Sequence, residues 1–218
     1  MNRRPTLLAA LALTATAALT LSACGGDDSS KGKDNDKIAG SDTGKTSASP
    51  SPSASTAADR PKIDLPSDLT YTFDWPKTGD QDKDAVLSDS EQSIKAVDLA
   101  IVNQNALDKA YVYYYEGEAA VGVENFVKEY VDAKVSITGA YRFYNPEVAV
   151  DKDGTASLSY CEDQGKAYAK DLKNGKVRKT KVTSDSYVIY HTSLKKNGKG
   201  VWAIQKIVSQ RGSAKCQP

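Results

Sequence analysis

The chain contains 218 residues, of which 26% are charged and 39% are apolar. Its 29 lysines and arginines balance 28 aspartates and glutamates, so the formal net charge of +1 gives no electrostatic reason to expect a nucleic acid as partner. With one histidine and three cysteines, the chain is also poor in the ligands that zinc and redox metals prefer. We therefore expect neither a metal site nor a cofactor.

The first 23 residues are predicted to be a signal peptide. Two arginines near the start precede a stretch over 7–20 that is rich in alanine, leucine and threonine, and small residues then lead to Cys24. The stretch is short for a retained transmembrane helix, which needs roughly 20 apolar residues. The tetrapeptide over 21–24 resembles the lipobox of bacterial lipoproteins. This resemblance implies lipidation at Cys24 and a protein that is anchored to the outer face of the cell membrane without spanning it. An ordinary secreted protein with a free Cys24 thiol remains the alternative.

Composition divides the rest of the chain into a linker and a domain. Residues 24–60 are rich in glycine, serine, proline, aspartate and lysine, with almost no large apolar side chains, which is typical of a disordered linker. Both tryptophans, all three phenylalanines and all twelve tyrosines lie in residues 61–218. These 158 residues are enough for one extracytoplasmic domain with its own core.

Two helices are predicted at the start of this domain. Apolar residues recur at helical spacing over 82–105 and again over 116–133. The segment over 111–115, which contains four tyrosines, joins them. We therefore expect a helical hairpin.

From residue 136 onward, apolar and polar residues alternate, and three glycine-containing turns, at 153–154, 174–175 and 197–198, are typical of β-hairpins. We expect strands over 136–150, 155–162, 166–173, 176–183, 186–195 and 200–210. Helices first and antiparallel strands afterwards predict an α+β fold, with the helices packed on a curved, mostly antiparallel sheet. Cys161 and Cys216 form an even pair in an exported chain, which predicts a disulfide between them.

Several segments together resemble a group of small surface lipoproteins of high-GC Gram-positive bacteria. They are the Asp-Trp-Pro entry over 74–76, the long first helix, the strand segments over 144–148 and 187–190, and the stretch over 160–163. A helical hairpin followed by such a sheet is similar to the nuclear-transport-factor-two-like cone fold. The resemblance implies a location and a fold, and it carries no activity.

The cone fold implies a pocket between helices and sheet, in which an acidic or basic residue could act on a ligand. His191 is a candidate base if its strand face is the concave one, although a histidine satisfied by a neighbouring strand is the alternative. Glu162 and Asp163 could lie at the pocket mouth or at a solvated strand end. The tyrosines offer a second candidate surface, either a platform for a partner or sugar, or packing at the helix junction. These are Tyr111, Tyr113, Tyr114 and Tyr115.

No motif for nucleophilic catalysis, phosphate binding or metal-dependent hydrolysis is present in the sequence. The sequence therefore predicts a non-catalytic, lipid-anchored binding or accessory protein of the cell envelope. Its partner would be a cell-wall component, an envelope protein or a small apolar ligand. The alternative is a small-molecule enzyme of the isomerase, dehydratase or hydrolase type, which uses the pocket.

Overall fold

In the computed structural model a short strand comes first, three helices follow it, and the other strands come after the helices. The structure describes residues 60–218. The helices are α1 (Gln81–Val102), α2 (Lys109–Tyr114) and α3 (Gly117–Ala133). The strands are β1 (Leu69–Phe73), β2 (Val135–Val150), β3 (Thr155–Asp171), β4 (Val177–Arg178), β5 (Tyr187–Lys196) and β6 (Trp202–Arg211). The predicted signal peptide, Cys24 and the predicted linker up to residue 59 lie outside the described residues.

The start of helix α1 is fixed by a capping aspartate, Asp80. The side chain of Asp80 accepts hydrogen bonds from the backbone N–H groups of Asp82 and Lys83, at 2.9 and 3.1 Å, and so caps the first turn. The apolar face of the helix is buried, and the chain leaves the helix at Asn103. None of the helices in residues 60–218 is both long and apolar enough to cross a membrane.

The sheet is mixed and strongly bent. Its strand order is β1-β2-β3-β5-β6, with β1 parallel to β2, the other pairs antiparallel, and the short β4 attached to β3. Two register shifts in β2, near Tyr141 and between Tyr144 and Glu147, mark bulges that bend the strand. Beside the first bulge, Gly139 has φ +106°, and a Cβ there would lie 2.1 Å from the carbonyl oxygen of Lys166. Only glycine allows this approach.

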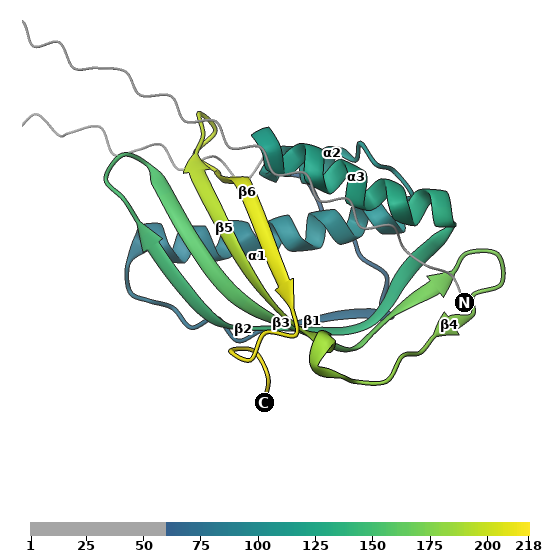
Figure 1. Ribbon diagram of the computed structural model, residues 1–218. Coiled ribbons are helices and arrows are strands. Elements are labelled where there is room, and N and C mark those ends of the chain that lie inside the picture. The colour runs from purple at the N-terminus through teal and green to yellow at the C-terminus, as the bar shows by residue number, and fades with distance from the viewer. Residues whose placement is uncertain (1–59) are drawn as a thin grey trace, which may run out of the picture. The chain divides into compact units, whose positions relative to one another are not determined.

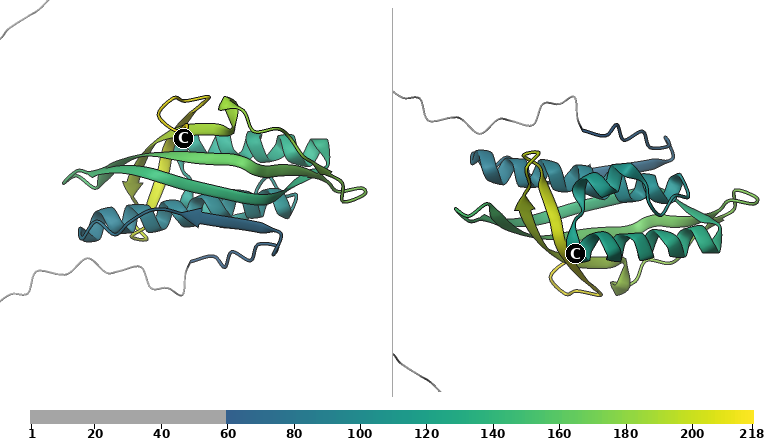
Figure 2. Two further views of the ribbon diagram at one scale, coloured as in Figure 1. Left: turned by 90° about the horizontal axis from the view of Figure 1, so that it is seen from below. Right: turned by 90° about the horizontal axis from the view of Figure 1, so that it is seen from above.

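The helices cover one face of this sheet. Figure 1 shows the long strands β2 and β3 bending beneath the helices, and the views of Figure 2 show the helix layer from one side and the sheet from the other. α1 packs against β2 and β6, and α3 packs mainly against β6. Trp202, Tyr111 and Leu158 are among the largest fully buried side chains between the layers. The predicted α+β fold class is confirmed.

Some predicted elements differ from the structure. The segments over 155–162 and 166–173 form one continuous strand, β3, and the segment over 176–183 contributes only the two residues of β4. The tyrosine-rich segment expected to join the helices contains the short helix α2. Strand β1 was not predicted, because a five-residue strand that pairs in parallel with a distant segment has no local turn to mark it.

Candidate functional site

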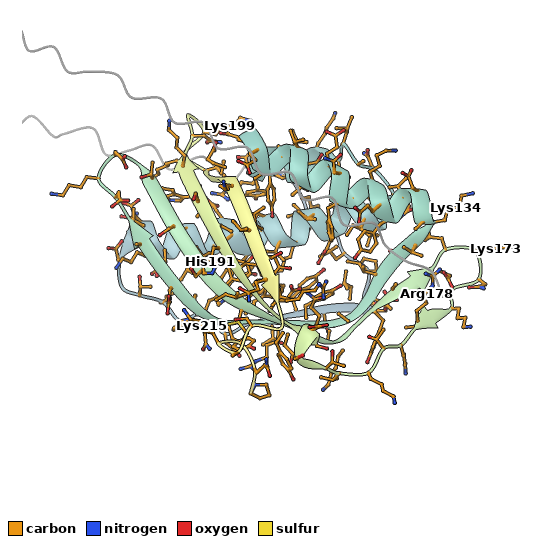
Figure 3. All side chains as sticks on the ribbon, in the orientation of Figure 1. Lys134, Lys173, Arg178, His191, Lys199 and Lys215 are labelled. Atoms are coloured by element: carbon orange, nitrogen blue, oxygen red, sulfur yellow. A yellow bond between two sulfur atoms is a disulfide. The ribbon has the colours of Figure 1, made fainter. Side chains whose placement is uncertain are left out.

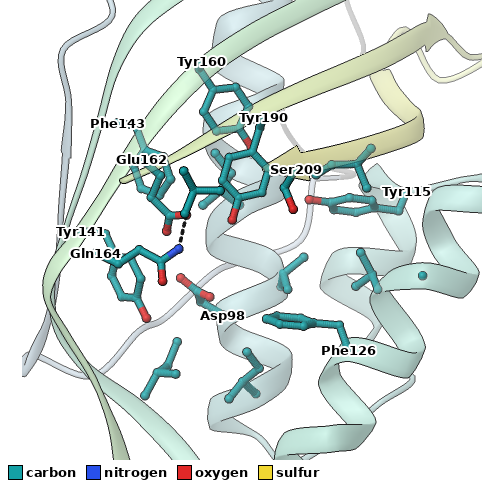
Figure 4. Close-up of a pocket in the computed structure, with 18 of the residues that line it drawn as sticks. Asp98, Tyr115, Phe126, Tyr141, Phe143, Tyr160, Glu162, Gln164, Tyr190 and Ser209 are labelled. Carbon is teal, nitrogen blue, oxygen red and sulfur yellow. Dashed lines mark hydrogen bonds between the residues drawn. The ribbon is translucent and has the colours of Figure 1, made fainter. Parts of the chain in front are cut away.

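A cavity of about 470 Å³ lies between the helices and the concave face of the sheet. Apolar and aromatic side chains form most of its wall, with a small number of polar groups among them (Figure 4). The helical side contributes Ile94, Val97, Asp98, Ile101, Tyr115, Gly122, Val123, Phe126 and Tyr130, and the sheet contributes Ile137, Tyr141, Phe143, Tyr160, Glu162, Gln164, Val188, Tyr190, Ile207, Ser209 and Arg211. This size and lining suit a small, largely apolar molecule.

Asp98 is the acidic group on the helical wall. It lies on α1 one turn after Ile94 and one turn before Ile101, so the helical repeat directs it into the same pocket as its apolar neighbours. The hydroxyl of Tyr71 donates a 2.7 Å hydrogen bond to its Oδ2 atom. Burial, together with the charge of Glu162, raises the pKa of Asp98 to about 7, although the bond from Tyr71 opposes the rise.

Glu162 is the acidic group on the sheet wall. It belongs to β3, it is buried, and its Oε2 atom accepts a 2.9 Å hydrogen bond from the side-chain amide of Gln164 (Figure 4). Burial raises its pKa to about 6, whereas Tyr190, Gln164 and the charge of Arg211 favour the ionised form and limit the rise. The pocket therefore holds two carboxyl groups that can each carry or release a proton near neutral pH.

Tyrosine hydroxyls supply the other polar atoms of the interior. Burial raises the pKa of Tyr115, Tyr141, Tyr160 and Tyr190 above the ordinary value, so all four stay protonated and can donate hydrogen bonds at neutral pH. Figure 4 shows these rings around the two carboxyl groups. Hydrogen-bond donors are thus available to an oxygen atom of a bound molecule.

The mouth of the pocket lies between α3 and the end of β6. Four lining residues are exposed there, and Phe126 keeps 44% of its side chain accessible. The other three are Gly122, Ser209 and Arg211. A ligand can therefore enter past an aromatic ring on one side and a guanidinium group on the other.

Of the three polar residues that the sequence offered as candidates for the pocket, Glu162 lines it, whereas His191 and Asp163 do not. His191 is exposed on the convex face of the sheet, where its Nδ1 atom lies 2.8 Å from Ser159 Oγ. Asp163 follows Glu162 directly and faces the opposite side of β3, where its carboxylate accepts a 2.7 Å bond from the N–H of Gly165. The condition for His191 to act as a base in this pocket is not met, because β5 presents Tyr190 to the pocket. The alternative, a histidine satisfied by a neighbouring strand, is what the structure shows.

The tyrosine-rich segment packs at the helix junction and does not form an exposed platform. Tyr111, Tyr114 and Tyr115 are 1%, 1% and 4% exposed, and the hydroxyl of Tyr111 donates a 2.6 Å bond to the carbonyl oxygen of Ala106. Tyr113 is half-buried against Tyr114. Of the four, only Tyr115 reaches the pocket.

The predicted disulfide between Cys161 and Cys216 is present, with Cα atoms 5.4 Å apart. It attaches the C-terminal segment to β3, and Tyr144 donates a hydrogen bond to the carbonyl oxygen of Cys216 beside it. In residues 60–218, no group of three or more histidine, cysteine or acidic side chains is placed to hold a metal ion. Basic side chains gather elsewhere, with Lys173 and Arg178 at the β3–β4 hairpin, at one end of the domain (Figure 3).

Sequence reasoning missed Asp98, the acidic group of the helical wall. The available signal was an aspartate inside an otherwise apolar helical stripe, at spacings of four and three residues from Ile94 and Ile101. An ionisable side chain at such a position is buried at a cost unless it has a partner or a function. The partner, Tyr71, lies on the unpredicted strand β1.

No model of a known protein family matches the chain, and no curated protein matches its sequence. Solved structures with a similar arrangement include a ketosteroid isomerase-like protein from Erwinia carotovora atroseptica, with 12% identity over 62% of this chain and 98% of that one and a TM-score of 0.41. A proposed aromatic ring hydroxylase from Novosphingobium aromaticivorans has 15% identity over 59% of this chain and 89% of that one, with a TM-score of 0.41. The intermembrane space region of the chloroplast protein ARC6 has 14% identity over 62% and 99%, with a TM-score of 0.38. At these identities the likeness concerns the fold alone.

The expectation that the chain is not an enzyme requires correction. It rested on the absence of catalytic motifs from the sequence. However, the structure brings Asp98 and Glu162 from separate segments of the chain into one largely apolar pocket, an arrangement that no local motif marks. Acid and base chemistry in this fold needs no local motif, because helix and sheet each supply one group.

Proposed function

We propose that the protein is an enzyme that moves a proton on a small apolar molecule bearing a carbonyl group, as an isomerase or a dehydratase. The observation that carries this proposal is the pair Asp98 and Glu162. Both face one apolar pocket, and burial places the pKa values of the two groups at about 7 and about 6. Acid and base groups with pKa values close to the working pH transfer protons most effectively.

The two carboxyl groups suit different roles, one as a base and the other as a hydrogen-bond donor. Glu162 has the lower pKa and accepts a hydrogen bond from Gln164, so it is mainly ionised at pH 7 and suits the role of base. Asp98 has the higher pKa and is about half protonated at that pH, so it can donate a hydrogen bond. Two carboxyl groups whose surroundings separate their pKa values are a recurrent arrangement for acid and base catalysis.

In the proposed reaction, Glu162 removes a proton from the carbon next to the carbonyl group. The electron pair of the broken C–H bond moves toward the carbonyl oxygen, which receives a hydrogen bond from protonated Asp98. Return of the proton from Glu162 to another carbon gives an isomer, whereas transfer of that proton to a departing β-hydroxyl group releases water and gives a dehydrated product. The apolar wall strengthens these interactions because it excludes water from around the developing charge.

The proposal is tested with a panel of β,γ-unsaturated ketones, whose conversion into conjugated isomers is followed by ultraviolet absorbance. Asp98→Asn and Glu162→Gln should each lower kcat/KM by about 10²- to 10⁴-fold, the usual contribution of a positioned acid or base. Asp163→Asn, which changes the neighbouring carboxylate on the opposite face of the sheet, should leave the rate within about twofold. A panel without turnover, or equal losses in all three variants, would contradict the proposal.

We also propose that Cys24 carries a lipid that holds the protein on the outer face of the cell membrane. The support is the lipobox-like sequence over 21–24 and the linker-like composition that follows it. Intact mass measurement after expression in a Gram-positive host should find a diacylglyceryl group that is lost in Cys24→Ala. An unlipidated, secreted chain would refute the anchor and leave the proposed chemistry unaffected.

A further inference from the structure

The arginine at the pocket mouth differs from the other arginines in residues 60–218. Three of them pair with an aspartate: Arg60 with Asp89, Arg142 with Asp74 and Arg178 with Asp171. Arg211 forms no ion pair within the part of the chain that the structure describes, and it lines the pocket. A guanidinium group with no carboxylate partner at the entrance of a ligand pocket is available to bind an anionic group.

The present contacts of Arg211 are long and can be exchanged. Its Nη atoms lie 3.4 Å from the side-chain oxygen of Gln164, and Nη1 lies 3.3 Å from the backbone carbonyl oxygen of Asp185. Both acceptors are neutral, so a carboxylate would form shorter and stronger hydrogen bonds with the same donors. Binding an anion would therefore replace weak contacts and would not break an ion pair.

Arg211 lies in line with Glu162 across the sheet. Glu162, Val188 and Arg211 are paired residues on the adjacent strands β3, β5 and β6, so the backbones of Glu162 and Arg211 lie two strand spacings apart, about 10 Å. Gln164 connects them, because it accepts from Arg211 and donates to Glu162. A molecule held at Arg211 by one end could thus extend along the sheet to Glu162.

The positive charge of Arg211 acts inside the pocket. It favours the ionised forms of Glu162, Tyr190 and Tyr141, whereas burial and the other carboxyl groups oppose ionisation. Asp98 and Glu162, the acidic groups of the pocket, lie deeper than the exposed Arg211. The entrance therefore attracts the anionic group of a ligand, and the interior accommodates its apolar part.

We propose that the ligand of this pocket is an apolar organic acid, whose carboxylate pairs with Arg211 at the mouth while its carbon skeleton fills the cavity. The position of the reacting carbonyl between Asp98 and Glu162 rests on the proposed function, but the binding preference does not require turnover. Arg211 is then the residue that selects acids over neutral molecules of the same shape.

Two fluorescent probes of nearly equal apolar volume test the preference, namely 2-naphthylacetate and 2-(2-naphthyl)ethanol. Fluorescence titration of residues 60–218 at pH 7.5 should find the acid bound about tenfold more tightly than the alcohol, as expected for a partly solvated charge-assisted pair. Arg211→Gln should remove this preference and leave alcohol binding within about twofold. Arg142→Gln changes an arginine that pairs with Asp74 away from the pocket and should retain the full preference.

Equal affinity of the wild-type protein for both probes, a preference that survives Arg211→Gln, or no binding of either probe would each overturn the inference. Glu162→Gln removes a negative charge from the pocket, so it should keep or increase the preference for the acid while it lowers turnover by the factor given above for this variant. If the acid preference holds but no carbonyl compound is turned over, the proposed function fails and the acid-binding site stands.

Discussion

Replacing Asp98 with asparagine should make the protein more stable, although the substitution removes a proposed catalytic group. The folded protein holds the pKa of Asp98 at about 7, compared with an ordinary value of 3.8, because burial disfavours its ionised form. In the unfolded chain the carboxyl group ionises freely. The wild-type protein therefore loses stability as the pH rises from about 4 to about 7, since the folded state binds the proton more tightly than the unfolded state.

The expected magnitude follows from the difference between the two pKa values. A difference of about three pKa units corresponds to about 4 kcal/mol when the group is fully ionised. Asparagine keeps an acceptor for the hydroxyl of Tyr71 but forms a weaker bond, so the net gain in the free energy of unfolding should be about 2 to 4 kcal/mol at pH 8. At pH 4 and below, where the aspartate is protonated in the folded state, the gain should nearly vanish.

Urea denaturation of residues 60–218 at several pH values between 4 and 9 measures this difference. The matched control is Asp151→Asn, which removes a carboxyl group in the exposed turn between β2 and β3. Its stability should follow that of the wild-type protein across the whole range. If Asp98→Asn is less stable than the wild type at pH 8, or if its effect is the same at every pH, the aspartate is not held in a destabilising environment and the reasoning fails.

Three further perturbations test other parts of the structure. Tyr71→Phe removes the 2.7 Å bond that favours ionised Asp98, so the pKa of this carboxyl group should rise further, by about one unit in a ¹³C NMR titration; an unchanged or lower value would contradict the role of the tyrosine. Replacing Cys161 and Cys216 together with serine should lower the free energy of unfolding by about 2 to 4 kcal/mol, and a loss below about 0.5 kcal/mol would show that the C-terminal attachment adds nothing. Gly139→Ala should lower thermal stability markedly, by several °C, because the added Cβ would meet a backbone carbonyl of β3; unchanged melting would contradict the bend at this position.

Local patterns predicted the long helices and most strands because their signals are periodic and close together. The apolar stripe of α1, its aspartate-rich start and the glycine turns between strands are visible without knowledge of the fold. The polar run over 162–165 predicts a break between two strands. In the folded chain it crosses the buried centre of β3, where Glu162 and Gln164 face the pocket and Asp163 does not.

The candidate site was only partly predictable, because it depends on which side of each strand faces the helices. Alternation places Tyr187, Ile189 and His191 together, but it does not say whether their face is concave or convex, and a change of one residue reverses the answer. Glu162 was named as a candidate, whereas Asp98 and Arg211 were not. The partners that place these two residues in the site, Tyr71 for Asp98 and Gln164 for Arg211, lie far away in the sequence. No regular spacing along the chain connects either residue with its partner.

The central claim is that Asp98 and Glu162 act together on a proton next to a carbonyl group. It is tested most directly by deuterium exchange of the α-protons of 2-tetralone in deuterium oxide, followed by ¹H NMR with residues 60–218 as the catalyst. We expect exchange with the wild-type protein to be well above the buffer rate. The rate of this exchange should fall by at least about 10²-fold in Glu162→Gln and in Asp98→Asn and should persist in Asp163→Asn. Exchange at the buffer rate with the wild-type protein, or equal exchange in all variants, would contradict it.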